Sequence, residues 1–489
     1  MTKLEKYFAP FKKNIVGNDQ LFTNELGTVK MIYADWIASG RFYKPIEERI
    51  SDDMGPFIGN THTGSNETAT RMTCSYHMAL RMIKEHVNAG KNDVIITAGT
   101  GMTSVINKFQ RILGLRNCHL LIESKCPKKC EKPVVFITHM EHHSNQTSWY
   151  ETSADVVLVK PGKDLLVDLN ELEQELIKYK NRRVKIGSFT ACSNVTGVTT
   201  PYHQMARLMH QYGGVCFIDF AASAPYSDMN MHPADPMEKL DAIFFSPHKF
   251  LGGPGSSGVL IFDSALYPNH APDRPGGGTV DWTNRWGEYK YVDDIEARED
   301  GGTPGFLQAI RTALCIDLKN KMGTANMLQR EEELLEIAFD MMPKIKGIHI
   351  LADNVKQRLG VISFYLEGVH YNLVVKLLND RFGIQVRGGC ACAGTYGHYL
   401  LDVSYQQSQN ITSKINHGDL SEKPGWVRLS LHPTMTNAEL VYVIDAINEV
   451  ALNHQKWAKD YNYSSHTNEF NYWKPIADDI EKVRGWFSI

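Results

Sequence analysis

Two polar residues that follow apolar runs are the strongest candidates for chemistry in this chain. The apolar run at 242–245 leads into Ser246-Pro247-His248-Lys249 and a glycine-rich turn at 252–255, and a second run at 215–218 ends in Asp219. A lysine in such a place can bind an aldehyde covalently, and a carboxylate can keep a pyridine nitrogen protonated so that the ring accepts electrons. Each residue alone is more often an ordinary surface or strand-end residue. Together they predict a pyridoxal phosphate site.

A glycine-rich stretch upstream could hold the phosphate of such a cofactor. Gly99-Thr100-Gly101-Met102-Thr103-Ser104 lies between a strand-like run and the helix-like segment 105–109. Glycines let backbone amides approach an anion, and the amino end of a helix adds positive potential. Thr103 and Ser104 add hydroxyl donors. Alone the stretch is weak evidence, because many folds place a capped helix after a glycine turn.

A histidine pair follows another strand-like run. Met140-Glu141-His142-His143-Ser144-Asn145 comes directly after the run that ends at Thr138. A histidine in this place could stack on a flat ring and move protons near neutral pH. The alternative is a strand-end histidine that bonds only to the backbone.

The elements that must position these residues follow an alternating pattern. Six apolar runs read as strands, and helix-like segments such as 169–177 separate several of them, which predicts an α/β layer structure with a mostly parallel sheet. From about residue 316 the pattern changes to a smaller α+β domain, with strands near 348–351 and 359–365 and a helix at 372–379. We therefore expect an N-terminal segment 1–30, a large domain 31–315 and a small domain 316–489. The six runs are 94–97, 134–137, 184–189, 215–218, 243–245 and 258–262.

Two polar stretches interrupt this pattern. The stretch 115–132 contains Cys118, Cys126 and Cys130 among lysines. Three cysteines are one short of a closed zinc site, so we expect an exposed loop and no metal centre. The stretch 402–425 is a second expected excursion on the surface.

Composition restricts the class of protein. The 489 residues are 43% hydrophobic and 22% charged, with a net charge of −3, which gives no electrostatic reason to expect a nucleic acid or membrane partner. No apolar run is long enough to cross a bilayer, and the charged amino terminus lacks a signal-peptide pattern. Nine cysteines, an odd number, suit a reducing compartment better than a disulfide framework. We expect a cytoplasmic protein.

These motifs occur in one order that resembles a known family. The chain is similar to the class V aminotransferase family of fold type I pyridoxal phosphate enzymes, and most similar to its cysteine desulfurase and selenocysteine lyase branch. The likeness runs from about residue 33 to 428 and implies a large domain with a seven-stranded sheet. The motifs that carry it are Tyr33-Ala34-Asp35, Glu141-His142-His143, Ser193-Asn194-Val195-Thr196-Gly197, Asp219, Ser246-Pro247-His248-Lys249, Gly276-Gly277-Gly278 and Gly301-Gly302-Thr303-Pro304-Gly305.

The resemblance implies roles for individual residues. Lys249 would bind the cofactor, Asp219 would pair with the pyridine nitrogen, and His142 would stack on the ring. Asn194 would lie near the ring's phenolic oxygen and the substrate carboxylate. Thr303 would reach the phosphate of a neighbouring subunit, so the active unit would be a homodimer. The remaining phosphate ligands would be the Met102 amide, Thr103, Ser246 and His248.

A cysteine pair near the end of the likeness indicates the branch. In Arg387-Gly388-Gly389-Cys390-Ala391-Cys392-Ala393-Gly394, Cys392 falls on the position of the nucleophile that takes sulfur from the substrate in desulfurases. Arg387 would favour its thiolate. Two small apolar fillers in a tight turn are the alternative reading. Arg428 matches an arginine that binds the substrate carboxylate.

Two departures from the family pattern accompany these matches. Ala222 stands where desulfurases usually carry a glutamine that bonds the phenolic oxygen, and 402–425 is inserted between the cysteine pair and Arg428. We expect an enzyme that removes sulfur or selenium from an L-cysteine-like amino acid, with a possible protein as sulfur acceptor. Another pyridoxal phosphate reaction, such as transamination, β-elimination or epimerisation, is the first alternative. A scaffold that has lost catalysis is the second.

Overall fold

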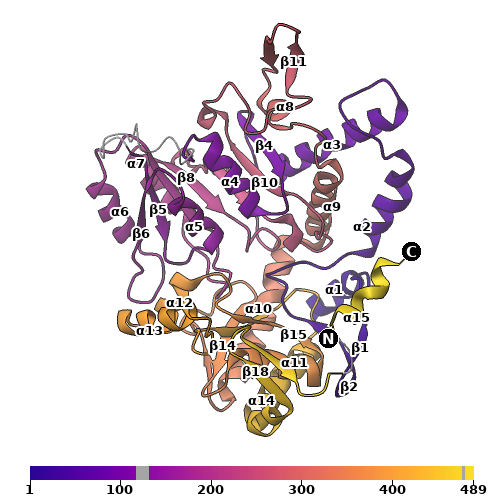
Figure 1. The fold of residues 1–489 in the computed structure, drawn as a ribbon, viewed down its shortest axis with the longest axis vertical. Coiled ribbons are helices and arrows are strands. Elements are labelled where there is room, and N and C mark those ends of the chain that lie inside the picture. Colours follow the sequence, from indigo (N-terminus) through magenta and orange to yellow (C-terminus); the bar gives the residue numbers. More distant parts are fainter. Residues whose placement is uncertain (117–131, 476–478, 489) are drawn as a thin grey trace. The chain divides into compact units, whose positions relative to one another are not determined.

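The computed structural model describes residues 1–116, 132–475 and 479–488. Its contacts divide the chain into two units (Figure 1). The first, here the sheet unit, consists of residues 14–16 and 37–328. The second, here the C-terminal unit, consists of residues 1–13, 17–36 and 329–489. The sequence-based domain boundaries at residues 30 and 315 stay a prediction.

The sheet unit is built around one seven-stranded sheet, which confirms the expected α/β class. The strand order is β4-β10-β9-β8-β7-β5-β6. Only β10 runs antiparallel to its neighbours β4 and β9. Each of the six predicted runs forms a strand, and β6 is the one strand of this sheet that lies outside them. The strands are β4 (Asp93–Ala98), β5 (Val134–Thr138), β6 (Asp155–Val159), β7 (Lys185–Thr190), β8 (Val215–Asp219), β9 (Ala242–Phe245) and β10 (Gly258–Asp263).

Burial explains why these runs form strands. Every residue of β5, β7 and β9 is buried, as expected for strands that are covered on both faces. Helices connect and cover them: α3 (Glu67–His86), α4 (Met102–Ile112), α5 (His143–Tyr150), α6 (Leu169–Lys178), α7 (Tyr202–Gln211) and α9 (Phe306–Met322). Asp168 caps α6 by accepting a hydrogen bond from the amide of Asn170, as its position before the helical pattern suggests.

The C-terminal unit has its own sheet and core. Its strands β13 (Ile348–Ile350), β14 (Val361–Leu366), β17 (Trp426–Ser430) and β16 (Arg387–Gly389) form an antiparallel sheet in that order. The helices α11 (Tyr371–Phe382) and α14 (Asn437–Trp457) contribute to its apolar core. This α+β pattern agrees with the strands and helix predicted near 348, 360 and 375.

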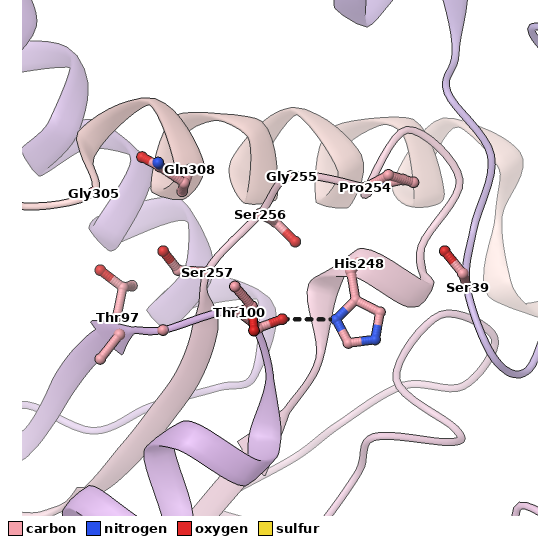
Figure 2. A pocket seen from close by; sticks show the side chains of 12 residues that line it. Ser39, Thr97, Thr100, His248, Pro254, Gly255, Ser256, Ser257, Gly305 and Gln308 are labelled. Carbon is pink, nitrogen blue, oxygen red and sulfur yellow. Dashed lines mark hydrogen bonds between the residues drawn. The ribbon is translucent and has the colours of Figure 1, made fainter. Parts of the chain in front are cut away.

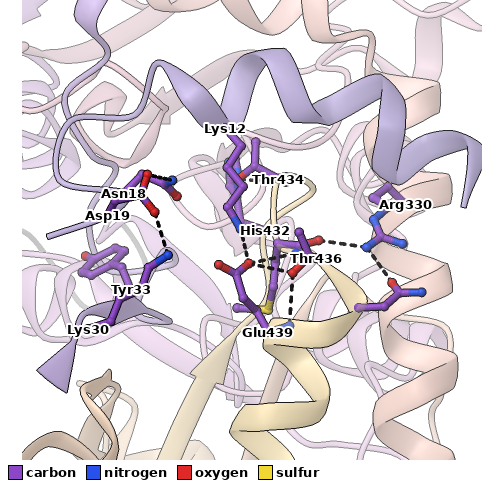
Figure 3. Close-up of polar contacts among 12 residues, drawn as sticks. Lys12, Asn18, Asp19, Lys30, Tyr33, Arg330, His432, Thr434, Thr436 and Glu439 are labelled. Atoms are coloured by element: carbon purple, nitrogen blue, oxygen red, sulfur yellow. Dashed lines mark hydrogen bonds and ion pairs between the residues drawn. The ribbon is translucent and has the colours of Figure 1, made fainter. Parts of the chain in front are cut away.

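The amino terminus packs within the C-terminal unit. In α1 (Lys3–Lys13), Lys12 forms an ion pair with Glu439 at the start of α14 (Figure 3). Glu439 also accepts from the Thr436 amide, and Thr436 in turn accepts from the Glu439 amide, so the two residues form a capping box. The hydroxyl of Thr2 donates to Glu333 at 2.9 Å. The first residues of the chain therefore belong structurally with its last third.

Of the two polar stretches that interrupt the sequence pattern, the structure describes 402–425 in full and only the ends of 115–132. Cys118, Cys126 and Cys130 lie outside the described residues. The stretch 402–425 forms a helix, α13 (Tyr405–Asn416), which Ser404 and Gln407 cap and which has no buried residue. This helix was not predicted, because its residues have no apolar stripe. None of the described helices has the length and apolarity that a membrane span requires.

A separate hairpin projects from the sheet unit, next to α8 (Ile295–Glu299) (Figure 1). It consists of β11 (Val280–Thr283) and β12 (Tyr289–Tyr291), which pair antiparallel. Three large aromatic side chains on it are exposed: Trp282, Trp286 and Tyr289. Such a concentration of exposed aromatic area is typical of an interaction surface.

Candidate active site

The topology brings several predicted residues to one edge of the seven-stranded sheet. Strands β5, β8 and β9 run parallel, and β4 has the same direction because β10 is antiparallel to both β4 and β9. The carboxyl ends of these four strands therefore meet at one edge, where α/β proteins bind ligands. Each of the four ends leads directly into predicted site residues: Gly99–Thr103, His142, Asp219 and Ser246–Lys249.

Asp219 is the buried carboxylate of this edge. It is 3% exposed, and its Oδ1 accepts a hydrogen bond from the Ala221 amide at 2.8 Å. Burial raises the pKa of Asp219 to about 6, while the Ala221 amide and the Lys249 ammonium favour the ionised form. Burial still outweighs these two favourable contacts. The carboxylate is therefore suited to bind a further positive charge, such as a protonated ring nitrogen.

Lys249 ends a short helical turn that follows β9. Its amide donates to the Ser246 carbonyl at 3.0 Å. Two glycines fix the path of the chain around it: a Cβ on Gly40 would lie 1.8 Å from the Phe250 carbonyl oxygen, and one on Gly253 would lie 1.9 Å from that of Pro247. No side chain fits at either position, so the segment that carries the lysine is held closely by its neighbours.

The beginning of α4 forms an anion cradle next to this turn. Its N-cap is Gly101, which has no side chain of its own that could cap the first amides of the helix. The Met102 amide donates to Ser246 Oγ at 2.9 Å, and His248 Nδ1 lies 2.9 Å from the Thr100 carbonyl. A Cβ on Gly101 would lie 2.9 Å from the His248 ring. The amides at a helix start, a hydroxyl and an imidazole around a glycine fit a phosphate group.

A cavity of about 620 Å³ adjoins the cradle at His248 (Figure 2). Hydroxyl groups dominate its wall, and none of its lining residues is acidic. Ser256 is 3% exposed, and its hydroxyl has no hydrogen-bond partner within the described structure. Hydroxyls come from Ser39, Thr97, Thr100, Ser256 and Ser257.

His142 is anchored as the N-cap of α5. Its Nδ1 accepts from the Ser144 amide at 3.1 Å, which makes Nε2 the protonated nitrogen of the neutral ring. The Ser144 hydroxyl lies 2.6 Å from Thr103 Oγ1. One serine thus connects His142 with the phosphate cradle.

Glu141 is a structural residue of the edge that sequence reasoning missed. It is 1% exposed and accepts from the Thr138 hydroxyl at 2.7 Å, the Asn145 side chain at 2.7 Å and the Thr190 amide at 3.0 Å. It thereby ties the ends of β5 and β7 together. Burial raises the pKa of Glu141 to about 7, and the Asp219 charge contributes to the rise. In the sequence, Glu141 is only a polar residue that closely follows the strand-like run ending at Thr138.

The other predicted residues of the sheet unit differ in exposure. Asn194, in the loop after β7, is 7% exposed. Thr303 is exposed. Ala222, at the position where the family's glutamine was expected, is buried and offers no side-chain donor.

In the C-terminal unit, Arg428 is held by an aspartate. Its guanidinium is 3% exposed and lies 2.8 Å from Asp35 Oδ1, while Arg387 Nε lies 3.0 Å from Asp35 Oδ2. Two cations therefore share one carboxylate and leave a net positive charge, as a site for a substrate carboxylate requires. Sequence reasoning missed this role of Asp35, which is far from both arginines in the chain.

The cysteine pair lies in a strained turn next to these arginines. Ala391 and Cys392 have φ angles of 50° and 56°, and the Ala393 amide donates to the Cys390 carbonyl at 3.0 Å. Two positive φ angles and this hydrogen bond define a type I′ turn, which normally requires glycine or asparagine. Cys392 is exposed, Cys390 is half-buried, and both thiols are free. Strain of this kind persists mainly at functional positions.

The described residues contain no group of acidic, histidine or cysteine side chains that could hold a metal ion. The donor set of the sheet edge instead suits an organic cofactor: an amine, a buried carboxylate, an imidazole and an anion cradle. These are the groups that pyridoxal phosphate needs.

Comparison with known proteins decides the family. The model of the family described as aminotransferase class V matches residues 32–443. The chain belongs to the class V aminotransferase family. It is therefore an enzyme that depends on pyridoxal phosphate.

Other class V proteins resemble this chain over most of its length. A probable cysteine desulfurase from Halalkalibacterium halodurans is 27% identical over 378 residues, which cover 76% of this chain and 86% of the relative. A cysteine desulfurase from Haloferax volcanii is 26% identical over 373 residues, with coverages of 75% and 81%.

Solved structures confirm the fold type I architecture of this class V enzyme. The apo structure of cysteine desulfurase from Thermococcus onnurineus superimposes with a TM-score of 0.72 at 21% identity, and covers 91% of this chain and 98% of its own. The cysteine desulfurase CsdA from Escherichia coli gives 0.66 at 22% identity, with coverages of 86% and 94%.

Proposed function

We propose that this enzyme removes sulfur or selenium from an L-cysteine-like amino acid, and leaves alanine and a persulfide on Cys392. The observation that carries the proposal is the exposed Cys392 thiol, held at a positive φ angle in the same unit as the Arg428 and Arg387 cations. The desulfurase names of the relatives support the same activity.

The sheet edge supplies the cofactor residues of this proposal. Lys249 would hold the cofactor through its aldehyde, Asp219 would keep the pyridine nitrogen protonated, and His142 would stack on the ring. Asn194 would lie near the ring's phenolic oxygen and the substrate carboxylate. Pyridoxal phosphate, when bound, withdraws electrons from the substrate's α-carbon. The phosphate ligands would be the Met102 amide, Thr103, Ser246 and His248.

The C-terminal unit supplies the substrate and sulfur residues. Arg428 binds the substrate carboxylate, and Asp35 keeps its guanidinium in place until the substrate arrives. The Cys392 thiolate attacks the substrate's sulfur. The carbon–sulfur bond then breaks with its electron pair on the carbon, which takes up a proton to give alanine. An exposed thiol next to cations meets the requirements for this attack.

We propose a homodimer as the active unit. Thr303 is exposed, so it is available to a partner's phosphate site. The cavity beside His248 leaves room for the segment around a partner's Thr303. The aromatic hairpin at 280–291 offers apolar area for an interface. The persulfide could pass to an acceptor protein, because Cys392 is exposed. The free thiols among the described cysteines suit a cytoplasmic location.

One observation favours a second candidate function. The buried Ala222 gives the ring's phenolic oxygen no side-chain donor at the expected position. Another class V reaction, such as transamination, β-elimination or epimerisation of a small amino acid, would use the sheet edge without needing Cys392.

Cysteine substitution distinguishes the two functions. Cys392→Ala should bind L-cysteine but release no alanine, because the sulfur has no acceptor. Cys390→Ala, two positions away, and Cys74→Ala, an exposed free thiol elsewhere, are the controls and should keep most activity. If Cys392→Ala consumes L-cysteine at the wild-type rate, the second function replaces the first.

A further inference from the structure

A buried lysine behind the active site has no part in the function proposed so far. Lys319 belongs to α9 and is 2% exposed. Its Nζ donates to the Ala224 carbonyl at 2.7 Å and to the Ser227 carbonyl at 2.6 Å, and lies 3.2 Å from His86 Nε2. Throughout the described chain, no carboxylate lies within ion-pair distance of it. A lysine is rarely buried without a carboxylate partner, which indicates that the buried ammonium of Lys319 has a specific role.

The three acceptors match the three protons of an ammonium group. Burial next to Lys319 lowers the pKa of His86 to about 3, so the imidazole is neutral and its Nε2 can accept. Burial also lowers the pKa of Lys319 to about 7, and the Asp228 charge opposes this change. The two carbonyls and the imidazole therefore replace the water that the ammonium has lost.

The two carbonyls belong to the segment that follows Asp219. Residues 220–227 form consecutive helical turns, in which the Ala224 amide bonds to the Phe220 carbonyl at 2.8 Å and the Ser227 amide to that of Ser223 at 2.9 Å. The last carbonyls of such turns lack partners, and a lysine commonly caps them. The same segment carries the Ala221 amide that donates to Asp219 Oδ1. Lys319 is thus linked to the Asp219 carboxylate through one short piece of backbone.

A second contact leads to the catalytic lysine. Lys319 Nζ lies 5.7 Å from the ring centroid of Phe250, within the range of a cation–π contact. Phe250 directly follows Lys249, is 2% exposed, and its amide bonds to the Pro247 carbonyl at 2.9 Å. One ammonium therefore touches both the segment after Asp219 and the residue after Lys249.

We propose that Lys319 is a positioning residue that fixes the Asp219 carboxylate and the Lys249 amine relative to each other. The inference rests on the proposed function only in that Asp219 and Lys249 are its cofactor residues. Lys319 acts through the Ala221 amide and the Phe250 ring, and it does not touch the cofactor itself. Removing the Lys319 ammonium should therefore make both Asp219 and Lys249 less well positioned.

Lys319→Met tests this in the full-length holoenzyme, because methionine keeps the buried apolar stem and loses the ammonium. Two properties should be measured: the rate at which cofactor is lost on dilution, and the pH midpoint of the visible cofactor absorbance. We expect cofactor loss to be faster by about tenfold or more, the usual effect of losing a charged hydrogen bond. We also expect the pH midpoint of the visible cofactor absorbance to differ from that of the wild type. Lys321→Met is the matched control, because Lys321 lies on the same helix, is exposed, and forms an ion pair with Asp317 one turn away.

The outcomes separate a positioning role from a purely structural one. Wild-type cofactor retention and an unchanged midpoint in a folded Lys319→Met protein would overturn the proposal, even if its thermal stability fell. Should that variant not fold, Phe250→Leu and His86→Ala each remove one contact and should show the same changes at smaller size. Wild-type values in both would equally overturn it. A wild-type enzyme that binds cofactor but makes no alanine would contradict the desulfurase proposal and leave this one intact.

Discussion

Replacement of Asp219 by asparagine should stabilise the cofactor-free protein while it disables the enzyme. Burial raises the pKa of Asp219 from 3.8 to about 6, which at about 1.36 kcal/mol for each pH unit corresponds to about 3 kcal/mol. The folded chain holds the proton more tightly than the unfolded chain. Its stability therefore falls as the pH rises from about 4 to 6, and the full cost remains above pH 6. Asparagine carries no charge, so it avoids this cost and can still accept from the Ala221 amide.

Urea unfolding of the cofactor-free proteins at pH 8 and pH 4 measures the effect. Asp219→Asn should gain up to about 3 kcal/mol over the wild type at pH 8, and almost nothing at pH 4. Asp340→Asn is the control, since Asp340 is exposed and pairs only with Lys344, and should change stability by no more than about 0.5 kcal/mol. With cofactor present, Asp219→Asn should lose about 10²-fold or more in turnover, as is usual when one preorganised charge is removed. An equal gain at both pH values, or a loss at pH 8, would refute the reasoning.

Four other substitutions test further parts of the account. Lys249→Ala should fold and lose the visible absorbance of lysine-bound cofactor; an unchanged spectrum would remove Lys249 from the site. Gly101→Ala should weaken cofactor binding in equilibrium titration, because its Cβ would lie 2.9 Å from the His248 ring, and wild-type affinity would contradict the phosphate cradle. Ala391→Gly should raise the free energy of unfolding by about 1 kcal/mol through relief of the φ angle of 50°, and a loss of stability in urea unfolding would argue against strain in this turn. Arg428→Ala should raise the KM for L-cysteine about tenfold or more, through loss of a charge-assisted pair, and an unchanged KM would show that it does not bind the carboxylate.

The sequence predicted what local patterns can encode. Continuous apolar runs identified β4, β5, β8, β9 and β10, because strands buried on both faces consist almost entirely of apolar residues. The run at 184–189 identified β7 although it contains Lys185, Gly187 and Ser188. The polar residues at their ends identified the candidate site, because parallel strands align their carboxyl ends. Helix α13 was missed because it lies on the surface and has no apolar stripe.

Local sequence patterns could not predict interactions between distant parts of the chain. Asp35 pairs with Arg428, 393 positions away, and Lys12 pairs with Glu439, 427 positions away. Neither pair has a local signal. The positive φ angles at Ala391 and Cys392 were also hidden, because neither residue is glycine.

The products formed from L-cysteine decide whether this enzyme is a desulfurase. The purified enzyme, exposed briefly to L-cysteine, should release alanine and carry one additional sulfur atom, located by peptide mass spectrometry at Cys392. Pyruvate in place of alanine, or an unmodified Cys392 after turnover, would contradict the account and assign the enzyme to another class V reaction.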